Sequence, residues 1–352
     1  MKINFIVPSI KTGGGYRVIQ EIANKLSGDN EVIIHCSNDG TSNTFILNRK
    51  VTIKKYGPQI TNKFARMFNM LYMLYKLKNE KNCFVSGTVL FPFLRIFKNV
   101  YYYMQADDYR LFDDKSLLKN NFLLWVYHTA LRFAYKYTNV KIIFNSQWTY
   151  AQYTKMTEQK FQMKKILLPG INHEVFYRRK KIEKNILTIG TVKRKQAMKG
   201  FSDFLAAVGK IEKKYKIEVL IACPEKFDEI HHKHWSFINP KSDQEMGDFY
   251  RKCDIFISTS LWEGFGLTAL EAMSCGVAVI TSDNGGCREY TIEHNNCLMY
   301  APGDQSELCK KIEILIKDTE KRNLIAQNGY ETSQSFSWEK MAKQFIDILE
   351  KS

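Results

Sequence analysis

The sequence predicts an α/β protein made of two doubly wound, Rossmann-like domains in tandem. Three observations predict this class. The length of 352 residues corresponds to about two domains. Short apolar runs rich in β-branched residues alternate with amphipathic stretches along both halves, and a glycine cluster separates the first run from the first amphipathic stretch. This alternation is typical of parallel sheets that helices cover on both faces.

The first half begins with the apolar run KINFIVPS, residues 2–9, which we expect to form a buried strand. Glycines follow at residues 13–15. The stretch YRVIQEIANKLSG, residues 16–28, has apolar residues at i, i+4 and i+8 and is expected to be a helix. Further strands are predicted, with helical patterns between them, at residues 31–37, 83–89, 100–104 and 141–144.

The second half repeats this plan. NILTIGTV at residues 185–192 and IEVLIAC at 217–223 are predicted strands, and KGFSDFLAAVGKIEKKY at 199–215 is a predicted helix. Shorter strands are expected at residues 235–240, 254–260 and 276–282. The join between the domains should fall near residues 170–184, where the charge composition changes and KKIEK is typical of a linker.

Composition excludes several classes of protein. Apolar residues make up 45% of the chain and charged residues 25%, as in soluble globular proteins, and 7 prolines rule out a proline-rich disordered chain. No stretch reaches the ~18 uninterrupted apolar residues of a membrane span, and the N-terminus lacks a signal-peptide cleavage pattern, so we expect a cytoplasmic protein. The eight cysteines lack metal-binding spacing and are expected to be reduced, mostly buried thiols.

The net charge of +16 is concentrated in the first half. Residues 1–168 contain 25 basic and 10 acidic residues, a net charge of +15, whereas residues 169–352 contain 27 and 26. This asymmetry indicates that the first half faces an anionic partner such as nucleic acid, an anionic membrane or a polyanion. A lysine excess that serves only solubility is the alternative.

Two amphipathic stretches in this half bear on that partner. In residues 62–78 the polar arc contains Lys63, Arg66 and Lys76, and the apolar arc contains Phe64, Phe68 and Leu71 among others. Such a helix either lies in a membrane interface or packs on the sheet, and both interpretations stay open here. For residues 122–137 we favour packing on the sheet. From the basic first half and the amphipathic residues 62–78, we expect a peripheral protein on the inner face of the cytoplasmic membrane.

The densest candidate site is SLWEGFGLTALEAMSCGVAVITSDNGGCRE, residues 260–289. It begins at the carboxyl end of a predicted strand, where open α/β sheets bind ligands. Gly264 and Gly266 permit a tight turn near a ligand, and the helix predicted after them offers unsatisfied N–H groups to an anion. Glu263 and Glu271 could hold hydroxyl groups on both sides of a diphosphate, as a sugar nucleotide requires. For Glu263, an ordinary helix start favoured by the dipole is the alternative.

This segment resembles the glutamate-pair signature of family 4 retaining glycosyltransferases, whose GT-B fold has two Rossmann-like domains facing each other across a cleft. TGGGYRVIQEIANKL resembles the family's N-terminal glycine loop and first helix. FNSQW, LLPGINHEVF and SFSWEKMAKQFIDILE resemble the end of its first domain, the entry to its second domain and its last helix. The resemblance covers essentially the whole chain. It implies an acceptor-side domain at 1–170, a nucleotide-sugar domain at 171–335, and a helix at 336–352 that crosses back to the first domain.

The resemblance also implies a role for each matched position. Glu263 would contact the hydroxyls of the donor sugar at the reacting end, and Glu271 would hold the ribose hydroxyls. Gly14 and Gly15 of the N-terminal glycine loop would contribute to donor binding. The positions between the glutamates would line the sugar and bind the phosphates: Gly264, Phe265 and Gly266 for the sugar, Leu267 and Thr268 for the phosphates.

Two cations are expected at the diphosphate leaving group. Lys199, followed by a glycine, matches the lysine of the family. The arginine that usually follows the first strand of the second domain is displaced here, because Thr191 stands after Gly190. We predict Arg194 for this role, since a planar guanidinium suits bidentate phosphate contact, with Lys193 as the other candidate.

The segment YYYMQADDYRLF departs from the family at its acceptor side. Many relatives have a histidine near the reacting sugar, and Gln105 holds about that place here. The segment resembles a bacterial branch that includes rhamnosyltransferases. Since an amide cannot act as a base, Asp107 or Asp108 is the candidate for contacting the acceptor or serving as its base. The alternative is that both aspartates cap the next helix.

The resemblance implies a metal-independent, retaining enzyme. It would move a sugar from a nucleoside-diphosphate sugar to a lipid-linked or glycan acceptor in bacterial surface polysaccharide synthesis, with no cofactor. His231, His232 and His234 lie together in the sequence, but no fourth zinc ligand is apparent.

Two other functions stay open: a GT-B nucleotide-sugar epimerase, and a non-catalytic protein that binds a polyanion or nucleic acid on a GT-B scaffold. The presence of Lys199, Glu263 and Glu271 argues against the second, so no nucleic-acid partner is expected.

Overall fold

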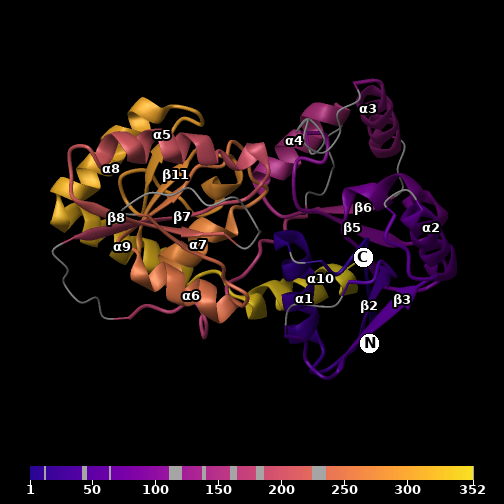
Figure 1. The fold of residues 1–352 in the computed structure, drawn as a ribbon. Helices are drawn as coiled ribbons and strands as arrows, with labels where there is room; N and C mark the ends of the chain where they lie inside the picture. Colours follow the sequence, from indigo (N-terminus) through magenta and orange to yellow (C-terminus); the bar gives the residue numbers. More distant parts are fainter. Residues whose placement is uncertain are drawn as a thin grey trace. The chain divides into compact units, whose positions relative to one another are not determined.

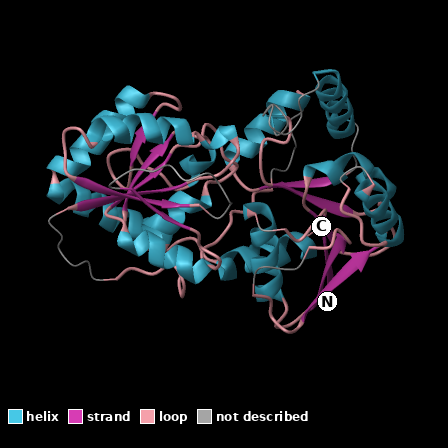
Figure 2. Ribbon diagram, in the orientation of Figure 1, coloured by secondary structure: helices cyan, strands magenta, loops and turns pink. Residues whose placement is uncertain are grey.

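The chain has the predicted α/β class, with two six-stranded parallel sheets and helices packed against them (Figure 1, Figure 2). The computed structural model describes residues 1–11, 13–41, 46–62, 65–110, 121–136, 140–158, 165–179, 186–223 and 235–351. The chain divides into two compact units, Met1–Gly170 with Trp338–Ser352, and Ile171–Ser337.

The sheet of the first unit has the strand order β3-β2-β1-β4-β5-β6. Strands β1, β2 and β5 are almost wholly buried runs of Val, Ile, Phe and Tyr, as expected of central strands in a parallel sheet. The strands are β1 (Lys2–Val7), β2 (Glu31–Ser37), β3 (Val51–Tyr56), β4 (Cys83–Val85), β5 (Val100–Met104) and β6 (Lys141–Phe144). The helices are α1 (Gly14–Leu26), α2 (Arg66–Leu77), the 3-10 helix η1 (Thr88–Ile96), α3 (Asn121–Lys136), α4 (Gln147–Thr157) and α10 (Trp338–Glu350).

The last helix, α10, packs within the first unit against α1. Its Phe345 is fully buried, and its ring lies 5.6 Å from that of Phe5 and 4.8 Å from that of Phe84. Glu339 forms an ion pair with Lys25 of α1. Aromatic burial therefore ties the C-terminal segment to the central strands β1 and β4 of this sheet.

The sheet of the second unit has the order β12-β11-β10-β7-β8-β9. Its strands are β7 (Leu187–Val192), β8 (Ile217–Ala222), β9 (Trp235–Ile238), β10 (Ile255–Ser258), β11 (Ala278–Ser282) and β12 (Leu298–Tyr300). Its helices are η3 (Ala197–Lys199), α5 (Phe201–Ile211), α6 (Asp243–Lys252), α7 (Leu267–Ser274), η4 (Gly286–Glu289), α8 (Gln305–Lys317) and α9 (Thr319–Ser333).

Three details differ from the sequence prediction. Strands β3 and β12 were not predicted, because β3 is a polar edge strand whose side chains are only half-buried or exposed, and β12 has only three residues. The strand predicted over residues 83–89 ends at Val85. Gly87, with a φ of 129°, turns the chain into η1, and a Cβ there would lie 2.5 Å from Cγ of Pro8.

Each sheet has a topological switch point, where ligands bind in open α/β folds. In the second sheet, β7, β8 and β9 extend one way and β10, β11 and β12 extend the other, so the switch lies between β7 and β10. In the first sheet it lies between β1 and β4. Close packing marks the second switch: a Cβ at Gly190 of β7 would lie 2.2 Å from Sγ of Cys253.

Candidate functional site

The switch point of the second sheet brings together two charged residues that lie 64 positions apart. Nζ of Lys199 donates to Oε1 of Glu263 at 2.6 Å, and the two side chains are 26% and 17% exposed. The hydroxyl of Ser260 donates to the same oxygen at 2.7 Å. Lys199 and Glu263, predicted separately as leaving-group cation and sugar ligand, therefore form one partly exposed cluster at the ends of β7 and β10.

Backbone packing holds Lys199 in this place. Gly200 has a φ of 62°, and a Cβ there would lie 2.0 Å from the carbonyl oxygen of Thr259. The hydroxyl of Thr259 donates to the carbonyl of Lys199 at 3.0 Å. Only glycine allows the chain that follows β7 to approach the end of β10 so closely.

The loop before α7 is held by residues to which the sequence assigned no role. A Cβ at Gly286 would lie 2.4 Å from the carbonyl carbon of Gly264 and 2.5 Å from the amide nitrogen of Phe265. Tyr290 donates its hydroxyl to the carbonyl of Gly266 at 2.6 Å, and the buried ring of Phe265 packs against it. In the sequence, the glycine pair that follows Asn284 could have indicated a close backbone approach at Gly286.

Helix α7 begins without a side-chain cap. Its N-cap is Gly266, with a φ of 88°, and its first turn contains no acidic residue. The N–H groups at the helix start, which include those of Leu267 and Thr268, therefore face no capping oxygen from a side chain. An anion is favoured at such an end by these donors and by the helix dipole.

Glu271 is only 3% exposed. Tyr250 of α6 donates its hydroxyl to Oε2 of Glu271 at 2.9 Å. Tyr250 was not predicted, and no local pattern links it to a residue 21 positions away. The carboxylate that was predicted to hold ribose hydroxyls is thus oriented by a tyrosine from the neighbouring helix.

The two other predicted cations lie in the loop after β7. Lys193 and Arg194 are both half-buried. Nζ of Lys193 lies 5.1 Å from the ring centroid of Phe201, a cation–π contact at the start of α5. Of the three predicted leaving-group cations, Lys199 is the one that pairs with Glu263.

The switch point of the first sheet contains Gln105, at the end of β5. Its amide nitrogen donates to the carbonyl of Gly15 at 2.9 Å and to the hydroxyl of Ser86 at 2.7 Å. Asn145 donates to the carbonyl of Gln105 at 2.9 Å. Gly15 lies in the first turn of α1, where Gly14 and Gly15 are exposed and no side chain caps the helix. The predicted acceptor-side glutamine and glycine loop therefore meet.

Asp107 accepts hydrogen bonds from the backbone N–H groups of Tyr109 and Arg110 at 3.1 and 3.2 Å. The guanidinium of Arg110 lies 3.5 Å from its other oxygen. These bonds tie Asp107 to the two residues that follow Asp108, and Asp107 is 4% exposed.

Asp108 is the centre of a buried hydroxyl cluster. Its carboxylate accepts from the hydroxyls of Tyr102 and Tyr135 at 2.5 Å each and from Thr88 at 2.7 Å. Burial raises the pKa of Asp108 above its usual value despite these three donors. With 2% exposure and three protein partners, the carboxylate of Asp108 joins β5, η1 and α3.

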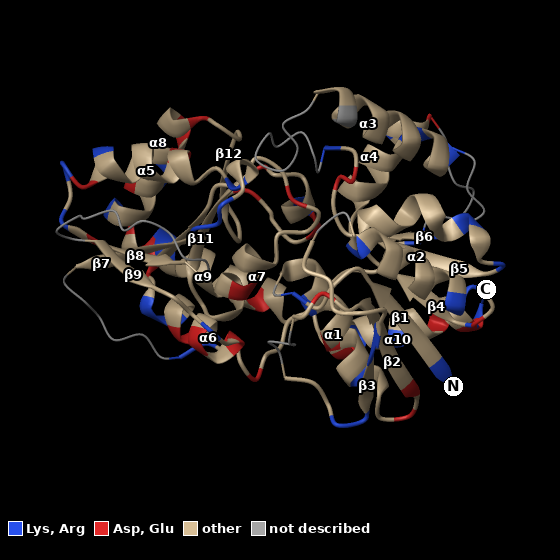
Figure 3. Cartoon of the chain, turned by 45° about the vertical axis from the view of Figure 1, so that its right-hand side comes forward, with Lys and Arg blue, Asp and Glu red and all other residues tan. Residues whose placement is uncertain are grey.

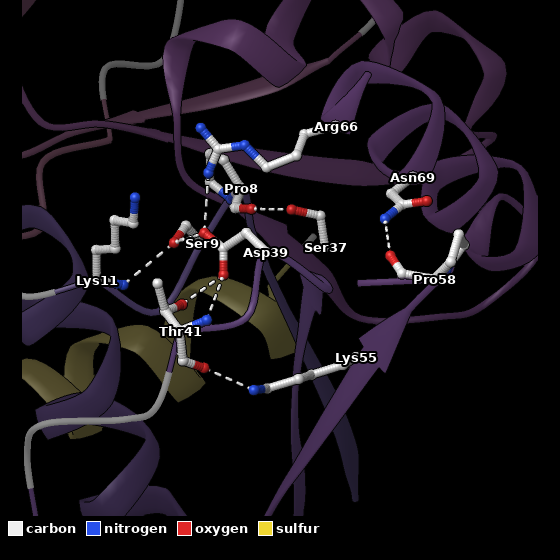
Figure 4. Close-up of polar contacts among 10 residues, drawn as sticks. All are labelled: Pro8, Ser9, Lys11, Ser37, Asp39, Thr41, Lys55, Pro58, Arg66 and Asn69. Atoms are coloured by element: carbon white, nitrogen blue, oxygen red, sulfur yellow. Dashed lines mark hydrogen bonds and ion pairs between the residues drawn. The ribbon is translucent and has the colours of Figure 1, made fainter. Parts of the chain in front are cut away.

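A second carboxylate cluster, at the ends of β1 and β2, was not predicted (Figure 4). Oδ2 of Asp39 accepts from the hydroxyl of Ser9 at 2.6 Å and pairs with Arg66 at 2.9 Å, and Oδ1 accepts from the N–H and hydroxyl of Thr41. Burial favours a higher pKa for Asp39, but the bonds from Ser9 and Thr41 outweigh it and lower the pKa. The Asp39 cluster therefore fixes the loops after β1 and β2 to the start of α2.

Two stretches were considered for membrane contact. Arg66 was predicted on the polar arc of residues 62–78, and its guanidinium pairs with Asp39 and is 16% exposed. Lys63 and Phe64 lie outside the described residues, while Phe68 is 74% exposed and Leu71 half-buried. Residues 122–137 were expected to pack on the sheet. One face of α3 is buried in the core of the first unit, where the helix packs against η1 and α4, and the other face is exposed.

The remaining predictions concern a histidine group and the eight cysteines. His231, His232 and His234 lie outside the described residues. Within the described ranges, no group of three His, Cys, Asp or Glu side chains is arranged to hold a metal ion. All eight cysteines keep their thiols, and seven are buried, as predicted.

Across the helices that the structure describes, none combines the length and apolar character needed to cross a bilayer.

Comparison with known proteins gives the following similarities. Residues 174–332 match the family described as glycosyl transferases group 1. An uncharacterized glycosyltransferase of Methanocaldococcus jannaschii is 38% identical over 107 residues, which is 30% of this chain and 30% of that protein. An N,N'-diacetylbacillosaminyl-diphospho-undecaprenol alpha-1,3-N-acetylgalactosaminyltransferase of Campylobacter jejuni is 27% identical over 115 residues, 33% of this chain and 30% of that protein. The chain thus spans about a third of the length of these curated relatives.

Solved structures are similar over the whole chain. Sucrose-phosphate synthase from Thermosynechococcus elongatus has a TM-score of 0.81 at 16% identity, covering 99% of this chain and 98% of that one. Anabaena HepE in complex with UDP-glucose has a TM-score of 0.74 at 17% identity, with full coverage of both chains. WaaG, involved in lipopolysaccharide biosynthesis, has a TM-score of 0.77 at 14% identity, covering 99% of this chain and all of that one. These likenesses concern the fold and confirm the GT-B prediction.

Proposed function

From the match of residues 174–332 to the group 1 glycosyl transferases, we propose that the chain transfers a sugar from a nucleoside-diphosphate sugar to a lipid-linked or glycan acceptor. The transfer retains the anomeric configuration and needs no metal. The product is a bacterial surface glycan made at the inner face of the cytoplasmic membrane. Nucleic acid is not a partner in this proposal.

The observation that carries the proposal is the pair of Lys199 and Glu263 at the switch point beside the uncapped start of α7. Cleavage of the bond between the anomeric carbon and the phosphate leaves a diphosphate with additional negative charge. Preorganised cations and N–H groups stabilise such charge electrostatically. Lys199 and the α7 start supply them, and Arg194 or Lys193 adds a second cation from the loop after β7.

Glu263 has two roles in this proposal. Its carboxylate accepts hydrogen bonds from the ammonium of Lys199 and from the hydroxyl of Ser260 at the same oxygen. When the diphosphate draws Lys199 away, the carboxylate is available to accept hydrogen bonds from hydroxyls of the donor sugar. The backbone of Gly264–Gly266 lines that sugar.

Glu271 binds the ribose of the nucleotide, with its carboxylate oriented by Tyr250. A ribose offers two neighbouring hydroxyl donors, which suit one carboxylate. Uridine diphosphate sugars are the first donors to test, since a structure similar in fold was solved with UDP-glucose.

The acceptor binds on the first unit. Gln105 is the candidate contact, because it follows the end of β5 and its side chain donates to the carbonyl of the exposed Gly15. A direct contact or base role for Asp107 stays a prediction, whereas we assign Asp108 to positioning because its carboxylate already accepts from three hydroxyls. A lipid-diphosphate acceptor is supported by the +15 charge of residues 1–168 and by the name of the Campylobacter relative.

Binding of a panel of sugar nucleotides, measured by thermal unfolding, tests the donor assignment. A donor at 100 times its Kd stabilises the folded state by about 2.7 kcal/mol. Transfer from the stabilising donor should then proceed in EDTA, and NMR of the product should show the donor's anomeric configuration. Stabilisation by no sugar nucleotide would refute the function. Activity lost in EDTA and restored by manganese would refute metal independence.

A further inference from the structure

Helix α3 exposes a continuous apolar face. Phe122, Trp125, Val126 and Phe133 are 67%, 62%, 40% and 57% exposed. Their spacing of i, i+3, i+4 and i+11 puts them on one side of a helix with 3.6 residues per turn. Thr129, also exposed, lies on the same side. A soluble helix normally turns such a stripe toward the core.

The opposite face of α3 is already occupied. Leu131, Ala134 and Tyr135 are buried in the core of the first unit, and α3 packs against η1 and α4. Figure 1 shows α3 beside α4. Because the core is filled from this side, the outer face has no place in the packing of that core. Its aromatic residues therefore require a separate explanation.

Charge indicates which surface would cover this face. The α3 sequence NFLLWVYHTALRFAYK contains Arg132 and Lys136 but no acidic residue. Helix α2, RMFNMLYMLYKL, packs against η1 as α3 does and also contains no acidic residue. Its Phe68, Tyr72 and Tyr75 are 74%, 49% and 60% exposed (Figure 3, basic residues in blue). Exposed Trp and Phe among cations are typical of helices that lie in the interface of an anionic bilayer.

The inner face of α3 contacts the acceptor-side loop. Tyr127 donates to the carbonyl of Asp108 at 2.8 Å, and Tyr135 donates to the carboxylate of Asp108. The ring of His128 lies within hydrogen-bond distance of the carbonyl of Tyr109, at 2.9 Å. These bonds connect the exposed helix to the segment that follows Gln105.

We propose that the outer face of α3 inserts into the interface of an anionic phospholipid bilayer and thereby holds the acceptor-side loop, residues 105–110, at the membrane surface. This inference rests on the proposed function insofar as a lipid-linked acceptor needs such a position. The insertion itself requires no catalysis. From the sequence alone, residues 122–137 were expected to pack on the sheet.

Flotation of the full-length protein with vesicles of phosphatidylcholine, with or without phosphatidylglycerol, tests the proposal. Wild type should float with the anionic vesicles. The double variant Trp125→Ser/Phe133→Ser should bind them at least about tenfold more weakly, because two apolar side chains no longer leave water. The matched control Ile292→Ser/Leu324→Ser changes residues of 58% and 57% exposure in the second unit and should float as wild type does.

A pair of substitutions at one site separates bilayer charge from folding. Thr129→Glu and Thr129→Lys alter only an exposed polar side chain, so both should fold. Thr129→Glu should weaken binding to anionic vesicles severalfold and Thr129→Lys should retain it, since each cation near anionic lipid contributes about 1 kcal/mol. Equal flotation of the two variants would overturn the assignment.

Other outcomes are equally decisive. Absence of flotation for wild type would overturn the proposal. A wild-type dimer that Trp125→Ser/Phe133→Ser converts to monomer, with flotation unchanged, would assign the face to a second copy of the chain. Stabilisation by nucleoside diphosphate is measured on the same proteins. If no variant binds nucleotide, the proposed function fails while the flotation result stands.

Discussion

The pair of Lys199 and Glu263 leads to opposite predictions for two conservative substitutions. Lys199→Gln removes the cation proposed to meet the diphosphate. A hydrogen bond to a charged group contributes about 1.5–3 kcal/mol, so the Kd for UDP should rise by about 10- to 100-fold. Glu263→Gln removes the carboxylate that pairs with the ammonium of Lys199 at 2.6 Å. Because the diphosphate then no longer competes with a carboxylate for Lys199, the Kd for UDP should stay unchanged or fall. Sugar transfer should decrease, since the sugar loses its carboxylate.

Calorimetric titration with UDP measures both effects, and a transfer assay measures turnover. The matched control is Lys214→Gln, which breaks the ion pair of Lys214 with Glu313 in the same unit, 3.1 Å long and outside the site. It should change neither quantity, since exposed pairs contribute little. If Glu263→Gln weakens UDP binding as strongly as Lys199→Gln does, the assignment of Lys199 to the diphosphate and Glu263 to the sugar is wrong.

Three further predictions concern the nucleotide, the loop and the first sheet. Glu271→Gln should keep an acceptor for Tyr250 yet weaken UDP binding about tenfold, because one charged acceptor for ribose is lost; wild-type affinity in calorimetry would show that the ribose assignment is wrong. Gly286→Ala should push the backbone of Gly264 and Phe265 away from residue 286, lower the free energy of unfolding in urea by about 1–3 kcal/mol and abolish transfer. The control Gly209→Ala in α5 has room for a methyl group and should stabilise the fold. Equal effects of the two substitutions would contradict the packing argument. Burial, followed by the charges of Lys54 and Lys2, lowers the pKa of His35 to about 4. The unfolded chain binds this proton from about pH 6.5, so stability should fall on acidification from there to pH 4 by up to about 1.4 kcal/mol per pH unit, and His35→Gln should flatten that slope in urea unfolding; unchanged slopes would refute the assignment.

Local patterns in the sequence were sufficient to predict most strands of both sheets, though not β3 or β12. The apolar runs at residues 2–7, 31–37 and 255–258 are buried on both sides, as central parallel strands must be, so they stand out without any tertiary information. The loop and helix after β10 were predicted for the same reason, because glycine positions and the carboxyl end of a strand define a ligand-binding turn locally. The polar edge strand β3 has no such run, and its pairing with β2 is a tertiary contact.

Partners distant in the sequence were decided only by the tertiary structure. The sequence by itself determined that Lys199, Glu263 and Glu271 are candidates. It did not determine that Lys199 and Glu263 share a bond, that Tyr250 orients Glu271, or that Arg66 turns to Asp39 instead of solvent. Likewise, the periodicity of residues 122–137 shows an apolar stripe on each side of the helix but not which stripe the core covers. A hydrogen bond or a buried face depends on which surfaces the folded chain brings within a few ångströms, and periodicity within one segment contains no information about the surface that meets it.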